Sequence, residues 1–295
     1  MSKRNYSNFI LFTAVALIWS SSFLFIKLAV HTVPPITIAA VRLIIAAILL
    51  YGYLRFLNSK LGTNRSEWRS FMFIGFFGNA LPFALIGIGE QSIDSSTAAI
   101  MMGIMPITTV ILAHLTIKEE PFTLKICVGI LLGFTGLVVL VGADALAGLT
   151  ATTTGQFSVL GAAICYAINT VYVRKSNASG GLKLATGSLI CGAIMVTPIC
   201  LWIDSPWTIT PSAEGTASVI ILSVFSTAVA TVMYFHLVKQ LGAATMSQVN
   251  YVIPVLGTIW GVTFMNEPLK ASSIAALVLV LCGVAIISSQ KRRVC

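Results

Sequence analysis

Polar, aromatic and methionine side chains interrupt long apolar stretches of this sequence, and they are the residues that could contact a small solute. Thr227, Thr231 and Tyr234 recur at helical spacing, which places them on one helix face. Gln248 and Tyr251 share a face in the next apolar stretch. Two neighbouring polar faces favour a wet pocket over lipid contact. The candidate contact residues are Trp19, Ser20, Asn79, Met101, Tyr166, Asn169, Thr227, Tyr234, Gln248 and Tyr251.

Several of these candidates also have simpler structural explanations. The hydroxyl of Ser20 could bond to the preceding helical turn, as small hydroxyls in membrane helices often do. Met101 has the composition of a packing residue, and packing is the reading we favour for it. Tyr234 lies near the end of an apolar run and could anchor at the membrane interface. An amide such as Asn169 is costlier in lipid, so we expect it to face a cavity.

Two charged residues, Arg42 and Glu90, lie within or at the end of an apolar run. Arg42 lies about eight residues into an apolar run, where a charge costs roughly 2.5 kcal/mol or more unless it is paired or hydrated. It could meet a substrate carboxylate, but we favour a structural arginine bonded to helix-end carbonyls. Glu90 ends the third run, and no acid lies well inside a run. A carboxylate proton relay therefore has little support, which favours uniport or exchange.

Prolines mark the places where these helices should be weakened. Asn79 precedes Pro82 by three residues, so its amide could line a cavity or satisfy the kink that the proline causes. Pro106 and Pro254 occupy nearly equivalent places in the two halves of the chain. The residues predicted to be structural or gating are Arg42, Pro82, Pro106, Pro254, Glu120 and Glu267.

The composition indicates an integral membrane protein. Of 295 residues, 57% are hydrophobic and only 9% are charged, with a mean hydropathy of +0.95. A soluble domain carries about 25% charged residues because its surface faces water. This chain must therefore place most of its surface in lipid, and the bilayer is its first expected partner.

Other classes of function lack their markers. The net charge of +9 comes from basic residues in short loops, which is typical of membrane topology and not of a nucleic-acid-binding stripe. The six cysteines have no metal-ligand spacing, and no ATP-binding, zinc-protease or hydrolase motif occurs. We expect no cofactor, no metal, no nucleic acid and no enzymatic activity.

Ten apolar runs are long enough to cross a bilayer, which needs about 20 residues each. With the N-terminus in the cytoplasm, 15 of the 18 basic residues fall on inner segments, and both termini are predicted to be cytoplasmic. The runs lie near 9–30, 34–56, 70–89, 95–117, 123–142, 156–175, 183–203, 215–238, 244–264 and 271–289.

The two halves of the chain resemble each other at an offset of 147 residues. The offset places Trp19 on Tyr166, and it places "KEEPFTLKICVGILLGFTG" on "MNEPLKASSIAALVLVLCG". Because each half holds five spans, the second half must enter the membrane from the opposite side. The expected fold is an all-α membrane protein of ten transmembrane helices, arranged as two inverted five-helix repeats of residues 1–147 and 148–295. Substrates of carriers with this plan bind near the repeat interface.

The sequence resembles the EamA-type members of the drug/metabolite transporter superfamily. The resemblance covers nearly the whole chain and rests on "ALIWSSSFLFIK", Arg42, "GIMPITTVILAHLTIKEEPFTLKICVGILLGFTGLVVL" and "VIPVLGTIWGVTFMNEPLKASSIAALVLVLCGVAII". It implies an inner-membrane exporter of amino acids or similar metabolites, for which we expect a small-molecule substrate and a monomer. The alternatives are a carrier of drugs, cations or nucleotide precursors and, further off, a membrane-embedded enzyme, although no cluster of Asp, His or Glu supports the last.

Overall fold

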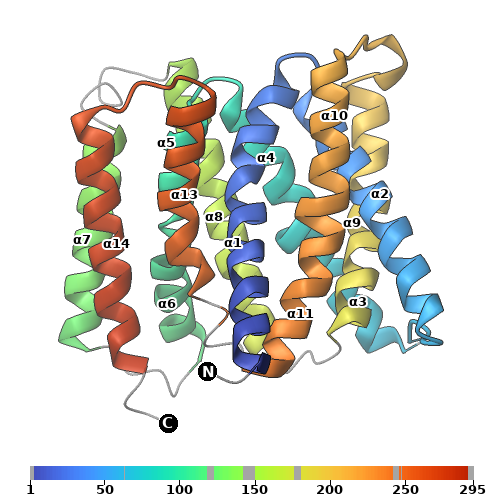
Figure 1. Cartoon of the computed structure of the whole chain (residues 1–295), viewed down its shortest axis with the longest axis horizontal. Helices are drawn as coiled ribbons and strands as arrows, with labels where there is room; N and C mark the ends of the chain where they lie inside the picture. The colour runs from blue at the N-terminus through green and yellow to red at the C-terminus, as the bar shows by residue number, and fades with distance from the viewer. Residues whose placement is uncertain are drawn as a thin grey trace.

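The computed structural model describes residues 3–62, 64–117, 123–141, 150–175, 181–241, 246 and 248–291. In these ranges the structure is a bundle of helices standing side by side (Figure 1). Nine helical segments are long and apolar enough to cross a membrane, and α13 (Val249–Phe264) is a shorter apolar helix that completes the expected ten. The all-α membrane fold predicted from the sequence is confirmed.

The first repeat contains spans one to five. These are α1 (Lys3–Val30), α2 (Pro35–Phe56), the third span built from α3 (Arg65–Gly75), η1 (Phe76–Ala80) and α4 (Leu81–Glu90), the fourth built from α5 (Ser95–Met102) and α6 (Met105–Thr116), and α7 (Leu124–Val141). Pro35 begins α2 because its fixed φ suits the first helical position, where the N–H has no helical partner. Pro106 likewise begins α6, after a break at Gly103 and Ile104.

The second repeat contains spans six to ten. These are α8 (Ala151–Lys175), α9 (Leu182–Ile203), the eighth span built from α10 (Ala213–Ile221), η4 (Leu222–Val229) and α11 (Ala230–Leu241), then α13 and α14 (Ala271–Lys291), with a short turn η3 (Pro206–Thr208) after α9. The start of α1 and the end of α14 lie on the same lower face, whereas α8 enters from the upper face (Figure 1). The predicted boundary between residues 147 and 148 lies outside the described residues and stays a prediction.

A π-helical segment interrupts one span in each repeat. In the third span it is η1, and in the eighth span it is η4. The offset of 147 places Phe76, the first residue of η1, on Ser223 inside η4 (76 + 147 = 223). Segments of this kind are rare and concentrate at functional sites. The internal symmetry of the sequence therefore extends to an irregularity of the backbone.

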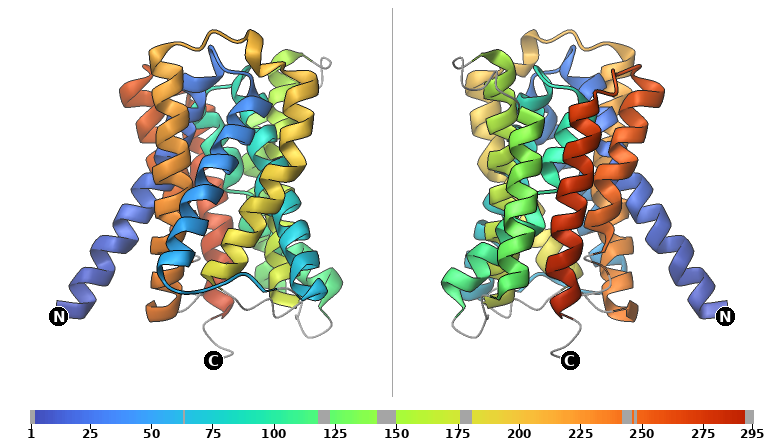
Figure 2. Two further views of the ribbon diagram at one scale, coloured as in Figure 1. Left: turned by 90° about the vertical axis from the view of Figure 1, so that its right-hand side faces the viewer. Right: turned by 90° about the vertical axis from the view of Figure 1, so that its left-hand side faces the viewer.

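The two halves of the bundle differ in how their cores are connected. In the upper half one apolar cluster joins residues from α1, α2, α4, α5, α8, α10 and η4, including Phe23, Ile38 and Ala99. In the lower half Val15 and Ala16 of α1 pack with Leu237 and Met246 in a separate cluster. The lower part of α1 also leans away from the bundle (Figure 2). Both clusters join residues of the two repeats, but the upper one draws on more helices.

The helices α7 and α14 pack closely through glycines and lie side by side (Figure 1). A Cβ atom built on Gly283 would lie 2.5 Å from the carbonyl oxygen of Gly129 and 3.0 Å from the amide nitrogen of Gly133. Small residues allow two membrane helices to approach at this distance. The contact joins the last span of each repeat.

Replacement of Gly283 by valine should separate these two helices. Since the clash is with backbone atoms, we expect Gly283→Val to reduce the free energy of unfolding by about 3 kcal/mol. Thermal unfolding of the detergent-purified protein measures this loss. Ala285→Val is the matched control, because Ala285 is an exposed residue of the same helix. Equal melting temperatures for the two variants would contradict the close packing.

Candidate functional site

The repeats meet along a seam between α5 and α13. A Cβ on Gly257 would lie 2.5 Å from the Cβ of Ala99, and one on Gly103 would lie 3.3 Å from the ring of Pro254. Pro254 is buried inside α13. Small residues and a proline therefore make the closest contacts of the seam, and Met101 and Ile253 belong to the cluster beside it. This allows the helices a close approach, and it places Pro254 at the repeat interface.

Glu267 ties the second repeat to the first at the upper end of this seam. One carboxylate oxygen accepts hydrogen bonds from the backbone N–H and the hydroxyl of Ser95, both at 2.7 Å. The other accepts from the N–H of Ser96 at 2.9 Å. A carboxylate at a helix start binds N–H groups that lack helical partners and interacts favourably with the helix dipole. Glu120, its predicted counterpart, lies outside the described residues.

A second acid makes a similar connection between the repeats. Asp204, which follows α9, accepts hydrogen bonds from the N–H and the hydroxyl of Thr37 at 2.7 and 2.8 Å. Thr37 belongs to the first turn of α2, so this helix start is also capped by the other repeat. The two contacts close the upper ends of the helices.

Lys27 binds the carbonyl groups at the end of the third span. Its ammonium donates to the carbonyl oxygens of Glu90 at 2.7 Å and of Ile93 at 2.8 Å. A cation is favourable there because the last carbonyls of a helix lack partners and carry partial negative charge. We expected Arg42 to bind helix-end carbonyls, and this expectation is wrong: Lys27 reaches these carbonyls because it extends from α1 toward the end of α4.

Arg42 lies in the protein interior, with a side chain 6% exposed. Its Nε donates to the hydroxyl oxygen of Thr227 at 2.7 Å, and the guanidinium carbon lies 3.9 Å from the ring centroid of Phe83. The Thr227 hydroxyl in turn donates to the carbonyl of Leu222 within η4. The other guanidinium N–H groups have no hydrogen bond within the described part of the chain. Arg42 thus connects α2 to the π-helical segment and keeps donors available for a ligand.

Glu90 is the most unusual group in this region. Its side chain is 0% exposed, and neither carboxylate oxygen has a hydrogen-bond partner among the described residues. Lys27, Glu267 and Arg42 all lie within electrostatic range of it. The sequence placed Glu90 at the outer end of a span, but packing against α1 and α8 encloses it.

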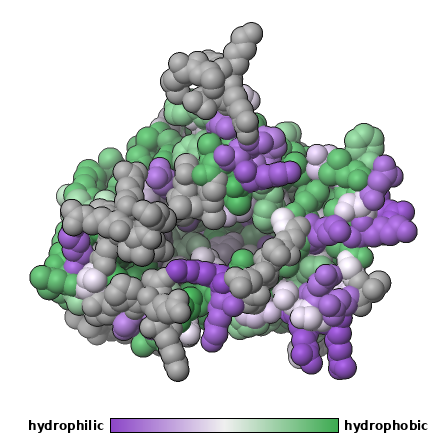
Figure 3. All heavy atoms as spheres, turned by 90° about the horizontal axis from the view of Figure 1, so that it is seen from below, coloured by the Kyte–Doolittle hydropathy of each residue, from purple (hydrophilic) through white to green (hydrophobic). Residues whose placement is uncertain are grey.

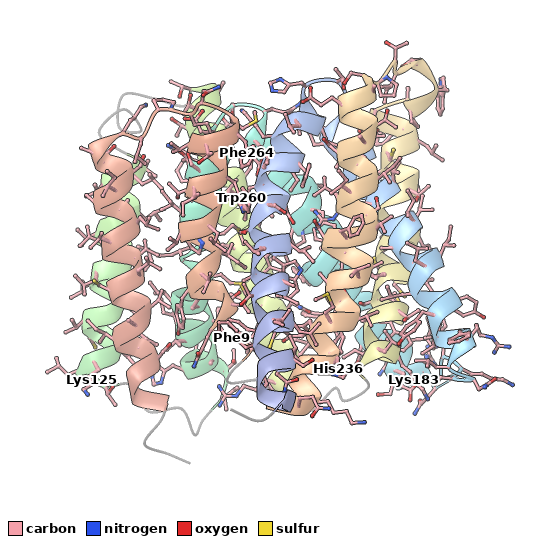
Figure 4. All side chains as sticks on the ribbon, in the orientation of Figure 1. Phe9, Lys125, Lys183, His236, Trp260 and Phe264 are labelled. Atoms are coloured by element: carbon pink, nitrogen blue, oxygen red, sulfur yellow. The ribbon has the colours of Figure 1, made fainter. Side chains whose placement is uncertain are left out.

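Aromatic candidates from the two repeats come together below this charged region. Trp19 and Tyr234 are in ring contact, with centroids 5.4 Å apart. The hydroxyl oxygen of Ser20 accepts a hydrogen bond from the indole N–H of Trp260 at 2.9 Å and donates to Leu17. Trp260 lies on α13 one turn from Phe264, and both are labelled in the upper part of Figure 4. Side chains of α1, α11 and α13 therefore form one polar and aromatic wall.

One asparagine candidate, Asn79, belongs to the π-helical segment of the third span, and the other, Asn169, contacts it. The amide of Asn79 donates to the hydroxyl of Ser188 at 3.2 Å and, at 3.4 Å, to the carbonyl of Ile74. Asn169 lies against Gly78, where a Cβ would come within 2.7 Å of its amide nitrogen. Its side-chain oxygen is buried and has no partner among the described residues. Asn79 thus supports the kink before Pro82 and faces α9, whereas Asn169 offers a free acceptor to the interior.

The remaining candidates are dispersed. Met101 is 1% exposed and belongs to the upper core, so it reaches no open cavity in this conformation. The hydroxyl of Tyr251 contacts Ser288 of α14, which directs it toward the outer helix pair. Gln248 is exposed just before α13. Tyr166 packs against the upper core within electrostatic range of Arg42. The ligand-contact role of these residues stays a prediction.

Three contributors to the region were missing from the predicted set. Lys27 is one of them, and its place in the last turn of the first span is a usable signal in the sequence. Trp260, an indole that needs an acceptor when buried, was another. Phe83 carries no distinguishing signal in the sequence. Among the described residues no group of three His, Cys, Asp or Glu side chains could hold a metal ion.

The lower face is polar and partly open. Seen from below, it carries hydrophilic side chains around a recess near its centre (Figure 3). A cavity of about 170 Å³ lies among the lower ends of α3, α6 and α8, bounded by Phe73, Leu112 and Tyr172. Exposed basic residues such as Lys125 and Lys183 border this face (Figure 4). A second cavity, of about 250 Å³, lies near the upper ends of α2 and α10, bounded by Val33, Thr37 and Val219.

Comparison with known proteins gives a consistent family match. The EamA-like transporter family matches residues 7–142 and again residues 153–289. The uncharacterized transporter YoaV of Bacillus subtilis is 24% identical over 276 residues, which covers 92% of this chain and 93% of YoaV. The uncharacterized inner membrane transporter YedA of Escherichia coli K12 is 25% identical over 280 residues, covering 94% and 89% of the two chains.

A similar protein also occurs in an archaeon, and the fold has a solved counterpart. An uncharacterized transporter of Archaeoglobus fulgidus is 25% identical over 272 residues, covering 91% of this chain and 94% of its own. One crystal structure of a protein superposes with a TM-score of 0.68 at 16% identity, covering 98% of each chain. At this identity the likeness demonstrates a shared fold.

Proposed function

Because this chain belongs to the EamA-like transporter family, we propose that it exports small zwitterionic metabolites, amino acids first, across a bacterial inner membrane. Transport would be secondary, by alternating access between the two inverted repeats. Both termini would be cytoplasmic, since the exposed lysines and arginines of the described chain, apart from Lys270, gather on the lower face. The upper face, where Glu267 and Asp204 tie the repeats together, would then be the outer one.

The observation that carries the proposal is the buried guanidinium of Arg42 at the repeat interface. It is 6% exposed, yet only its Nε bonds to a described residue. Guanidinium groups bind carboxylates through paired N–H donors, so the free donors suit a substrate carboxylate. The free oxygen of Asn169 adds an acceptor, and the Trp19–Tyr234 pair adds an apolar wall. This combination matches a zwitterion with an apolar side chain.

Alternating access has a physical basis in the contacts described above. The small-residue seam between α5 and α13 resists sliding less than interlocked large side chains would. The upper half is closed by the caps from Glu267 and Asp204. Release of these caps and closure of the lower half would produce the opposite conformation. Carriers with inverted repeats move in this way about a fixed central site.

Transport in liposomes tests the proposal directly. A thermal-shift screen of the purified protein against the twenty amino acids selects ligands first, because a ligand that binds the folded state raises its melting temperature. We expect uptake of a labelled hit into protein-containing liposomes above that into empty ones. Uptake of none of the twenty would overturn the amino-acid assignment. Uptake of an organic cation or a nucleotide precursor instead would support the alternative substrate classes.

Loss of the aromatic wall should weaken solute binding. We expect Tyr234→Ala to reduce uptake of the identified solute about tenfold, because truncation of a half-buried aromatic contact costs roughly 1–2 kcal/mol. Initial uptake rates in liposomes provide the measurement. Tyr53→Ala is the control, since Tyr53 is an exposed residue of α2. If both variants transport at the same rate, Tyr234 is an interfacial anchor only.

A further inference from the structure

Three acids near the upper face, Glu267, Asp204 and Glu90, differ in the number of hydrogen bonds that their carboxylates receive. Glu267 receives three hydrogen bonds, and Asp204 receives two from Thr37. Glu90 is more deeply buried than either and receives none among the described residues. Hydrogen-bond donors are present at this end of the bundle, because helix-start N–H groups and hydroxyls bind the other two acids, but none of them reaches Glu90.

The cations near Glu90 are already engaged with other groups. The Lys27 ammonium bonds to the backbone carbonyls of Glu90 and Ile93 and not to the carboxylate. Arg42 of α2 directs its Nε to Thr227, away from Glu90. Both cations still favour a negative charge at this distance, whereas Glu267 opposes one.

Among the described residues, Lys27 and Arg42 are the cations within electrostatic range of Glu90. Tyr166 of α8 lies within electrostatic range of Arg42, and Cys165 precedes it on the same helix. Asp94 precedes α5 and is half-buried, and α5 itself contains no ionisable side chain between Ser95 and Met102. Among the described residues, therefore, no group donates a hydrogen bond to the Glu90 carboxylate, and the two nearby cations are engaged with other groups.

A buried carboxylate without hydrogen-bond donors is more stable when it binds a proton and becomes neutral. An unpaired ion costs several kcal/mol when it is removed from water, and the usual outcome is a change of protonation state. Opening of the upper half would hydrate the carboxyl and release Lys27 from the carbonyls, and both changes favour ionisation. The two conformations therefore differ in their affinity for a proton.

We propose that Glu90 is a proton-binding site whose occupancy stabilises the upper-closed conformation. The proton is bound while the upper half is closed and is exchanged with the upper compartment when it opens. A ligand that binds one of two conformations more tightly shifts the equilibrium toward it. A higher proton concentration in the upper compartment then shifts the equilibrium toward the upper-closed conformation. The effect of this shift on transport rests on the proposed function, whereas the proton site itself does not. From the sequence alone a carboxyl proton site had little support, and the burial of Glu90 is the observation that now favours one.

Infrared spectroscopy of the detergent-purified full chain tests the site without any solute. Wild type should show the C=O stretch of a protonated carboxyl at neutral pH, and this band should fade at alkaline pH. Glu90→Gln should lack the band. Glu214→Gln, which removes an exposed acid from α10 by the same chemical change, should keep it. Absence of the band in wild type, its persistence in Glu90→Gln, or a band that never titrates would each overturn the proposal.

Thermal unfolding gives a second, independent measurement. If the folded protein holds a proton that the unfolded chain releases, its melting temperature should fall as the pH rises above the carboxyl range of the unfolded chain. Glu90→Gln should melt like wild type at neutral pH and lose about half or more of this pH dependence, whereas Glu214→Gln should retain it. Strong destabilisation of Glu90→Gln at neutral pH would instead indicate an ionised carboxylate paired with Lys27.

The two experiments separate this inference from the proposed function. If no amino acid is transported but the band titrates, the substrate assignment is wrong and the proton site stands. If amino acids are transported but the band is absent, the proton site is wrong and the carrier function stands.

Discussion

Glu267→Gln should lower the free energy of unfolding by about 2–3 kcal/mol, because three hydrogen bonds from Ser95 and Ser96 converge on this carboxylate. An amide can keep only one acceptor oxygen, so its NH₂ group would face a backbone N–H that also donates. The side chain is 8% exposed, so water cannot easily replace the lost acceptor.

The effect should be local to the seam and visible in hydrogen exchange. The first amides of α5 have no helical acceptor, so loss of the cap exposes them. We expect faster deuterium uptake in the peptide that spans the start of α5, together with the lower melting temperature. Since about 1.4 kcal/mol changes an equilibrium tenfold, the same loss should also populate the upper-open conformation.

Glu214→Gln serves as the control for this prediction. Glu214 also lies in the first turn of a helix, but there the cap is the Ser212 hydroxyl, which accepts from Gly215 at 3.0 Å. Its loss should change stability by no more than a few tenths of a kcal/mol. If Glu267→Gln behaves like Glu214→Gln in both measurements, the cap does not hold the upper half closed.

Arg42→Met should abolish transport while the protein stays folded. Replacement of a buried charge by an apolar side chain of similar length is often neutral or stabilising, so the melting temperature should hold. The substrate carboxylate, by contrast, would lose a guanidinium interaction worth about 3 kcal/mol, which corresponds to roughly a hundredfold loss in uptake rate. Initial rates with the identified solute and thermal unfolding of the same preparation measure the two effects.

Two further variants define how Arg42 acts. Arg42→Lys keeps the charge but loses the planar fork and the Nε donor to Thr227, so we expect uptake at least about tenfold below wild type. Arg55→Met makes the same change at an exposed position of the same helix and should transport normally. A folded Arg42→Met protein with wild-type uptake would show that the guanidinium is structural. Unfolding of Arg42→Met that Arg42→Lys restores would lead to the same conclusion.

The spans, their number and the internal repeat could be read from the sequence because each depends on local properties. A bilayer requires about 20 apolar residues per crossing, and this requirement acts on each segment separately. The prolines also have local consequences, and Pro82 and Pro106 do begin helical segments in the structure. The offset of 147 residues even locates the second π-helical segment once the first is known.

The partners of the polar residues could not be read in the same way, since they belong to helices far apart in the chain. Glu267 and Ser95 are separated by 172 residues, and Arg42 and Thr227 by 185. Which of two nearby cations reaches the end of α4 depends on the rotation of each helix, and Lys27 rather than Arg42 is the one that does. Tyr251 shares a helix face with Gln248 in the sequence, yet its hydroxyl contacts the outer helix α14.

Sequence by itself determined that this protein lies in a membrane, crosses it in ten spans and consists of two inverted halves. These follow from hydropathy, charge and repetition along one chain. Only the tertiary structure decided that Glu90 is enclosed without a partner and that Arg42 keeps free donors at the repeat interface. The physical reason is that burial and hydrogen bonding depend on how the helices pack against one another. Every span meets the hydrophobic requirement of the bilayer, so hydropathy alone does not determine which helices are neighbours or which faces they turn toward each other.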